Sequence, residues 1–202
     1  MNYLICLKYM KNLAYLRPSH LSSKESKILQ GRDFIQKLNH LDQIWKCLKN
    51  KYGDTLAVKD LRGKNKEEFS YSELDQLITK ASYAFFKIGL RKGDVVTIIS
   101  ENSPRWLIAD QAIMRLSAID AVRGINSPAV ELDYIIKHSK SVGLIIQSNS
   151  IWEKLENKEE LLKNLKFIIN FEDFSDNGIL SWEEFIELGN KIIPDSYKAE
   201  VD

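Results

Sequence analysis

The sequence predicts an α/β fold in which helices flank a mostly parallel β-sheet. Two observations lead to this prediction. Short apolar runs rich in β-branched residues, such as Val95–Ile99, alternate with longer segments whose apolar residues recur every three or four positions. Runs that are apolar on both faces are typical of a sheet covered on both sides, as in βαβ units with right-handed crossovers.

The first elements are expected between residues 32 and 71. A helix is predicted by apolar residues at steps of three and four: Phe34, Leu38, Leu41, Trp45 and Leu48. Gly53 should end this helix. Two short strands, Leu56–Asp60 and Glu68–Tyr71, flank polar residues 62–66 and are expected to pair as a hairpin.

A second helix is expected to begin at Ser72. Ser72 and Asp75 resemble a capping box, in which each side chain accepts a hydrogen bond from a backbone N–H of the first turn. The apolar face of this helix comprises Leu74, Leu77, Ile78, Ala81, Phe85 and Ile88. Gly89 stands where a left-handed residue commonly follows a helix.

Strands and helices alternate through the remainder of the chain. Strands are expected at Val95–Ile99, Ile119–Val122, Val142–Gln147 and Lys166–Asn170. Helices are expected to start at Ser103-Pro104 and Ser127-Pro128, to run over Ile151–Asn164, and to follow Ser181. The Ser-Pro starts are favoured because serine caps a helix and proline fits its first position.

Composition excludes several classes of protein. With 202 residues, 44% hydrophobic and 28% charged, the chain can bury a core and is not of the intrinsically disordered class. The net charge of +1 and the scattered Lys and Arg residues argue against nucleic acid as a partner. No apolar run approaches the ~20 residues that a membrane helix needs, so no transmembrane segment is expected.

The first 31 residues are set apart from the rest. They are interpreted as an unstructured leader or a misassigned start, with a membrane-surface role as the alternative. Cys6 and Cys47 have no metal-ligand spacing, and Cys47 lies beside an apolar stripe as a small core or boundary residue. A reduced, cytoplasmic location is therefore expected.

Candidate catalytic and binding residues are few. No two glycines lie within three residues of each other, so neither a P-loop nor a dinucleotide-binding loop can form. His20, His40 and His138 stand alone, and His138 is assigned to a helix end rather than to catalysis. Arg123-Gly124 follows a strand, where an anion contact is a minor alternative to a structural turn.

One segment fits the pattern of a calcium-binding EF-hand loop. In residues 173–184 the ligand positions are Asp173, Ser175, Asn177 and Glu184, with Gly178 at the sharp turn. The segment before it reads as a strand rather than a helix, and Ser and Asn supply little charge. A strand–turn–helix connection without calcium is therefore the favoured interpretation.

From residue 32 onward the sequence resembles the amino-terminal part of the AMP-forming (adenylate-forming) acyl synthetases. The features that carry the resemblance, in order, are Tyr71, Leu74, Ala81, Gly89, Gly93-Asp94, Val96, Asn102, Trp106, Asp110, Ala118, Glu131-Leu132 and Ser139. The segments Asp110–Met114 and Ala121–Gly124 are most similar to long-chain fatty acid–CoA ligases and acyl–acyl-carrier-protein synthetases. The family usually has Gly where this chain has Ser117, which would cost on the order of 1 kcal/mol if that residue is left-handed.

The resemblance implies a two-step reaction. Fatty acid and ATP with magnesium give an acyl-adenylate and pyrophosphate, and the thiol of coenzyme A or of acyl-carrier protein then displaces AMP. The family's Ser/Thr/Gly-rich loop, magnesium-binding Glu, ribose-binding Asp and lid lysine have no counterpart in this sequence. We therefore assign no catalytic, cofactor-binding or metal residue to this chain.

These absences lead to an expectation for the whole chain. Residues 32–202 are expected to form a truncated adenylation domain that lacks the ATP loop, the acyl tunnel and the carboxyl-terminal lid. The chain alone should be inactive and should self-associate through exposed apolar surface. Two alternatives stay open: a split ligase completed by a separately encoded downstream fragment, and a non-catalytic binding module with calcium at residues 173–184.

Overall fold

The central element of the computed structural model is a parallel sheet of five strands in the order β4-β3-β5-β6-β7. The structure describes residues 41, 43–61, 67–172, 175–176, 178–190 and 197. The strands are β3 (Val95–Ile99), β4 (Ile119–Arg123), β5 (Gly143–Ile146), β6 (Phe167–Asn170) and β7 (Ile179–Ser181). The predicted leader lies outside the described residues, as do Phe34 and Leu38, the first two apolar positions of the first predicted helix.

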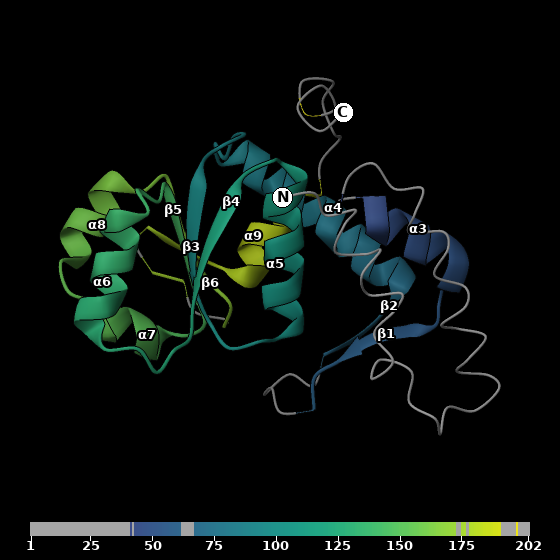
Figure 1. The fold of residues 1–202 in the computed structure, drawn as a ribbon, viewed down its shortest axis with the longest axis horizontal. Helices are drawn as coiled ribbons and strands as arrows, with labels where there is room; N and C mark the ends of the chain where they lie inside the picture. Colours follow the sequence, from purple (N-terminus) through teal and green to yellow (C-terminus); the bar gives the residue numbers. More distant parts are fainter. Residues whose placement is uncertain are drawn as a thin grey trace, which may run out of the picture. The chain divides into compact units, whose positions relative to one another are not determined.

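Helices cover both faces of this sheet, as Figure 1 shows. On one side lie α4 (Tyr71–Lys87), α5 (Pro104–Arg115) and α9 (Trp182–Leu188), and on the other lie α6 (Ala129–His138), α7 (Asn149–Lys154) and α8 (Lys158–Asn164). Phe85, Ile98 and Ile113 belong to the core on the α4 side, and Leu132 and Ile146 to the core on the α6 side. The predicted α/β fold with a mostly parallel sheet is confirmed.

The predicted hairpin is also present. Helix α3 (Gln43–Tyr52) leads into β1 (Leu56–Lys59), which pairs antiparallel with β2 (Glu68–Ser70). Gly53 follows α3 with a φ of +50°, a left-handed conformation that suits glycine after a helix. Helix α3 packs on α4 on the side away from the sheet (Figure 1).

The predicted start of α4 was wrong by two residues. The N-cap is Ser70, whose Oγ accepts from the N–H of Glu73 at 3.2 Å, while the Glu73 carboxylate accepts from the Ser70 N–H at 2.8 Å. Asp75 is instead buried, where it pairs with Lys49 at 3.1 Å. Strand β2 runs directly into α4, so the last strand residue is also the cap.

The single helix expected over Ile151–Asn164 is also wrong, because it is two short helices. Leu155 is extended, with a ψ of 142°, and Asn157 is left-handed, with a φ of 54°. This break lets both Leu155 and Leu161 reach the core on the α6 side. Asparagine tolerates the left-handed conformation better than most residues, which explains why the chain breaks here.

Other local predictions are confirmed. Ser103 caps α5 by accepting from the N–H of Trp106 at 3.1 Å, with Pro104 as the first helical residue. Gly89 has a φ of +95°, and Ser117 is left-handed with a φ of +53°, so the strain expected of a non-glycine residue is present.

The predicted start of α6 at Ser127-Pro128 was wrong in its cap. Pro128 itself is the N-cap, no side chain caps the helix, and the first helical residue is Ala129.

Strand β7 was not predicted. It has only three residues, pairs in parallel with β6, and ends in Ser181, which caps α9. A run this short carries too little alternation to be recognised in the sequence. No helix in the described part of the chain has the length and apolarity needed to span a lipid bilayer.

Candidate functional site

The carboxyl ends of β3 and β5 lie where the strand order of the sheet reverses. From β3 the chain first adds β4 on one side, and it then continues with β5, β6 and β7 on the other side. The direction in which strands are added therefore changes between β3 and β5. In open parallel sheets, ligands bind in the crevice outside the carboxyl ends at such a reversal. The loops that follow β3 and β5 therefore form the candidate site.

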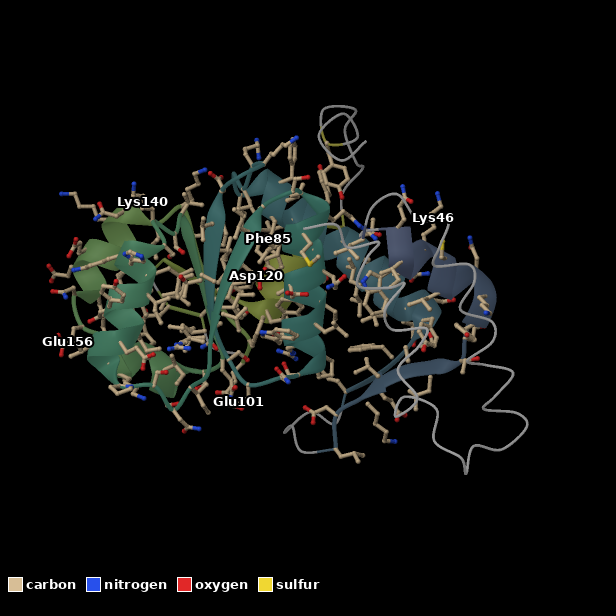
Figure 2. The ribbon with its side chains drawn as sticks, viewed as in Figure 1. Lys46, Phe85, Glu101, Asp120, Lys140 and Glu156 are labelled. Atoms are coloured by element: carbon tan, nitrogen blue, oxygen red, sulfur yellow. The ribbon has the colours of Figure 1, made fainter. Side chains whose placement is uncertain are left out.

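Hydrogen bonds tie these two loops together. Gln147 donates its backbone N–H to the Ile99 carbonyl at 2.9 Å, and its side-chain Oε1 accepts from the Glu101 N–H at 2.8 Å. Ser100 donates its hydroxyl to the Glu101 carbonyl at 2.7 Å. Figure 2 shows Glu101 at this edge, with Lys140 at the opposite end of the sheet. Gln147 therefore joins the two loops through hydrogen bonds.

Arg123, the candidate anion contact, also lies at this edge. Its guanidinium pairs with the carboxylate of Glu131 on α6. A Cβ added at Gly124 would lie 3.6 Å from the nearest atom, a Glu101 carboxylate oxygen, which is an ordinary contact. The geometry therefore does not require glycine here, and the cation is already paired with a carboxylate. Neither observation supports a phosphate cradle.

A buried arginine that sequence reasoning missed lies at the same edge. Arg105, in the first turn of α5, donates Nε to Glu67 at 2.7 Å and donates to the Phe171 carbonyl, and it pairs with Glu183 at 2.9 Å. The side chain therefore connects the hairpin, the end of β6 and helix α9. The available sequence signal was a charged residue, directly after the cap motif Ser103-Pro104, in the first turn of a helix that packs on the sheet.

The EF-hand-like segment has a different structure from a calcium loop. The element that enters it is β6, a strand, as predicted. The Glu184 carboxylate, in the twelfth position, accepts from the Ser181 N–H at 2.9 Å and so forms the capping box of α9. Asp173 and Asn177 lie outside the described residues. The absence of calcium binding stays a prediction.

A surface hollow of about 580 Å³ lies beside this segment. Its lining includes Ser175, Asp176, Gly178, Glu184 and Lys166. Lys166 precedes β6 and Gly178 precedes β7, so the hollow lies at the amino ends of these strands. This is the edge opposite to the one where ligands bind in open parallel sheets.

The remaining candidates are not brought together. His138 is exposed and stacks on the ring of Tyr134, one turn earlier in α6, with ring centroids 5.0 Å apart. Cys47 is a half-buried free thiol on α3. Among the described residues, no three His, Cys, Asp or Glu side chains are grouped as metal ligands would be. His20, His40 and Cys6 lie outside the described part.

Two facing carboxyl groups on α5 and β4 are a second feature that sequence reasoning missed. Asp110 lies in hydrogen-bonding contact with Asp120, and Gln111 donates Nε2 to Asp110 at 2.6 Å. Trp45 of α3 donates its indole N–H to Gln111 at 2.6 Å. Burial raises the pKa of Asp110 to about 6; the Gln111 hydrogen bond opposes this rise and the Asp120 charge adds to it. An Asp inside a predicted strand was the available signal.

The described residues therefore do not fit ATP with magnesium. At the carboxyl edge, Arg105 and Arg123 are paired with carboxylates, and Glu101 is a single exposed acid. Phosphates are held by crowded backbone amides and cations, and magnesium by carboxylates with several waters.

A protein-family model and several curated proteins are similar to this chain. Residues 46–196 match the family model of the AMP-binding enzymes. The Arabidopsis thaliana protein named "Probable acyl-activating enzyme 16, chloroplastic" is 30% identical over 164 residues, covering 81% of this chain and 21% of that protein. A chloroplastic long-chain-fatty-acid–[acyl-carrier-protein] ligase of the same plant is 26% identical, covering 74% and 22%. Human long-chain-fatty-acid–CoA ligase ACSBG1 is 28% identical, covering 76% and 22%.

Solved structures show the same fold. Coronafacic acid ligase from Pectobacterium brasiliense matches with a TM-score of 0.64 at 20% identity, over 72% of this chain and 29% of that one. The anthranilate CoA ligase AuaEII in complex with anthranoyl-AMP matches with a TM-score of 0.65 at 18% identity, over 72% and 27%. The chain spans about a fifth of the length of the curated relatives it matches.

Proposed function

Because the chain belongs to the AMP-binding enzyme family, we propose that it forms the amino-terminal part of an ATP-dependent ligase that joins long-chain fatty acids to a thiol. The observation that carries the proposal is the family match over residues 46–196. Relatives named for long-chain fatty acids, with coenzyme A or acyl-carrier protein as the acceptor, support the choice of substrate class.

The chemistry of such a ligase follows from the poor reactivity of a carboxylate. A carboxylate oxygen of the fatty acid attacks the α-phosphorus of ATP, and the bond to pyrophosphate breaks. The thiol then attacks the acyl carbon of the adenylate, and AMP leaves with the bonding electrons. Both steps need cations around the phosphates to neutralise developing charge.

In this proposal the described residues contribute structure rather than catalysis. The sheet edge at β3 and β5 is polar but internally hydrogen-bonded, and its arginines Arg105 and Arg123 are paired with carboxylates. Such an arrangement fixes loops precisely, which is what a reacting centre needs from its supporting shell. The phosphate-binding loop and the lid would come from the rest of the ligase.

Pyrophosphate exchange tests the proposal. The purified 202-residue chain is expected to show no fatty-acid-dependent exchange of labelled pyrophosphate into ATP, because it lacks the phosphate loop and the lid lysine. A mock preparation from cells without the gene is the control. Exchange that survives purification would place the chemistry within these residues and contradict the proposal.

The complete ligase provides the positive half of the test. Reading the DNA around the coding sequence should find the Ser/Thr/Gly-rich loop, in the same frame or in a neighbouring one. Co-production of that part with the present chain is expected to give exchange that depends on fatty acid. Mass spectrometry of the acyl product, with coenzyme A and acyl-carrier protein supplied separately, would identify the thiol acceptor.

The alternative of a calcium-binding module has weaker support. Its twelfth-position ligand, Glu184, is engaged in the cap of α9, and a strand takes the place of the entering helix. An EF-hand needs that glutamate as a bidentate ligand. Calcium binding would therefore require α9 to give up its cap.

A further inference from the structure

Strand β4 is an open edge of the sheet in the described part of the chain. It pairs with β3, and the N–H of Ile119 donates to the Asp94 carbonyl at 2.9 Å, while the Arg123 carbonyl accepts from the Ser100 N–H at 3.0 Å. Because the backbone groups of successive strand residues point to alternate sides, Asp120 and Val122 direct their N–H and C=O groups away from β3.

The two edges of the sheet are not equivalent. At the β7 edge, Ile179 is 3% exposed and Ser181 8% exposed, so that edge is covered. At the β4 edge, Ile119 is 54% exposed and Val122 is 41% exposed, although both are apolar. An exposed apolar edge with unpaired backbone groups is a template for another strand, and proteins usually protect such edges.

The charge at this edge selects the kind of strand that fits. Asp120 is half-buried and lies on the α5 side of β4, as Figure 2 shows, beside the carboxyl group of Asp110. Val122, two residues on, has its side chain on the same face. A strand added beside β4 would place one side chain directly opposite Asp120, where an opposite charge stabilises and a like charge destabilises.

We propose that β4, Ile119–Arg123, is the docking site for a strand that carries a Lys or Arg opposite Asp120, with apolar residues on either side of it on that face. The inference rests on the proposed function, since the strand is supplied by the remainder of the ligase, and this chain matches only about a fifth of the length of the relatives. Peptide binding by such edges uses main-chain hydrogen bonds for affinity and alternate side chains for specificity.

A second copy of this chain is a poorer occupant. Pairing β4 with another β4 would bring the Asp120 and Asp110 carboxyl groups of both copies to one junction, without a cation to compensate them. Like charges across strands are destabilising. The same carboxyl groups that attract a basic strand therefore repel a second copy of β4 at this edge.

Hydrogen exchange of individual backbone amides, measured by NMR on the full 202-residue chain, tests the inference. The probe is a seven-residue peptide that alternates threonine and valine and has lysine at its centre, so that valines flank the lysine on one face. The matched control has glutamate at the centre. Without peptide, the amides of Asp120 and Val122 should exchange fast, whereas that of Ala121, which points to β3, should be protected.

The lysine peptide is expected to slow exchange at Asp120 and Val122 and to leave Ala121 unchanged, with an affinity about tenfold above that of the glutamate peptide. The variant Asp120→Asn should remove most of that preference. Equal binding of both peptides, or binding of neither, would overturn the inference, as would protection of Asp120 that rises with protein concentration alone. None of these results bears on the ligase proposal, because pyrophosphate exchange tests that proposal separately.

Discussion

At the level of single residues, two serines two positions apart show how a helix start is chosen. Ser70 and Ser72 both precede an acidic residue by three positions, Glu73 and Asp75 respectively. In the structure Ser70 is the cap. The carbonyl groups of Thr55 and Gly53 accept hydrogen bonds from the N–H groups of Tyr71 and Ser72, and these bonds hold the start of α4 beside the residues that precede β1. Tertiary contacts therefore decided between two equivalent local signals.

Replacing the true cap should cost stability where replacing the neighbouring serine does not. Ser70→Ala is expected to lower the free energy of unfolding by about 1 kcal/mol, because an N–H of the first turn loses its acceptor. Ser72→Ala is the matched control, with a change near zero, measured by denaturant unfolding of both variants. Equal losses in the two variants would contradict the cap assignment.

The same cap has a pH dependence with a definite sign. Hydrogen bonds from the Ser70 backbone, and then from its hydroxyl, hold the pKa of Glu73 below its ordinary value of 4.5. The stabilisation from this carboxylate is therefore complete above that ordinary value. It is lost as the pH falls through the lower pKa of the folded state.

The pair of Asp110 and Asp120 should act in the opposite direction. The folded-state pKa of Asp110 is about 6, above the ordinary 3.8, so between these values the folded chain holds a proton that the unfolded chain has released. Stability therefore falls as the pH rises through this window. Asp110→Asn is expected to stabilise by about 1 kcal/mol at about pH 8, after allowing for solvent screening, and by much less at about pH 4.

Thermal unfolding at both pH values measures this effect, with Asp54→Asn, at a solvent-exposed position, as the control for loss of a charge. The asparagine can still accept the hydrogen bond from Gln111, so packing at the site is retained. A gain in stability of the same size at both pH values would show that the effect does not come from titration of Asp110.

At the level of elements, the sequence was sufficient for those with strong periodicity. Strand β3 is apolar on both faces, and α5 begins with Ser103-Pro104, so both could be located from local chemistry. The failures share a physical cause. Strand β7 is three residues long, and the break between α7 and α8 depends on where Leu155 and Leu161 pack, which is a tertiary property.

The candidate site could be predicted less well than the fold. The absence of a glycine-rich loop was visible in the sequence, but the pairing of Arg105 with Glu67 and Glu183 joins residues far apart in the chain. Asp110 and Asp120 are close in the chain but approach each other only because α5 crosses beside β4. Tertiary contacts of this kind have no local sequence signal.

The contact between α9 and α4 depends on a glycine. A Cβ at Gly189 would lie 2.8 Å from the carbonyl carbon of Lys80, and this neighbour is backbone and cannot rotate away. Gly189→Ala is therefore expected to destabilise the chain by about 1–3 kcal/mol through overpacking. The rings of Phe85 and Phe185, 4.5 Å apart, would be pushed from each other.

Gly124→Ala is the matched control, since its nearest neighbour would be 3.6 Å away and its φ is not left-handed. Denaturant unfolding measures both variants, and near-ultraviolet circular dichroism reports the aromatic packing of Phe85 and Phe185. If the two alanines had the same small effect, the close approach of α9 to α4 would not be a constraint on the fold.

At the level of the whole molecule, large apolar side chains remain exposed after this fold is complete. Leu61 is 76% exposed and Val130 is 72% exposed. Tyr134, one turn beyond Val130 on α6, is 60% exposed. Scattered apolar residues are normal on a surface, but neighbouring ones mark an interaction face. In the proposed ligase, other parts of the protein would cover such faces.

The isolated chain is accordingly expected to bind the dye ANS and to self-associate as its concentration rises, because exposed apolar surface gains free energy when it is removed from water. The double change Val130→Ser with Tyr134→Ser should lower both signals, whereas Lys137→Ser, an exposed polar position on α6, should not. ANS fluorescence and sedimentation velocity over a range of concentrations measure them. A monomer that binds no ANS and unfolds in one sharp transition above ~60 °C, the upper range for mesophilic domains, would instead identify a self-sufficient domain. In that case the exposed face of α6 would need no partner, and the alternative of a non-catalytic binding module would explain the chain better than a part of a ligase does.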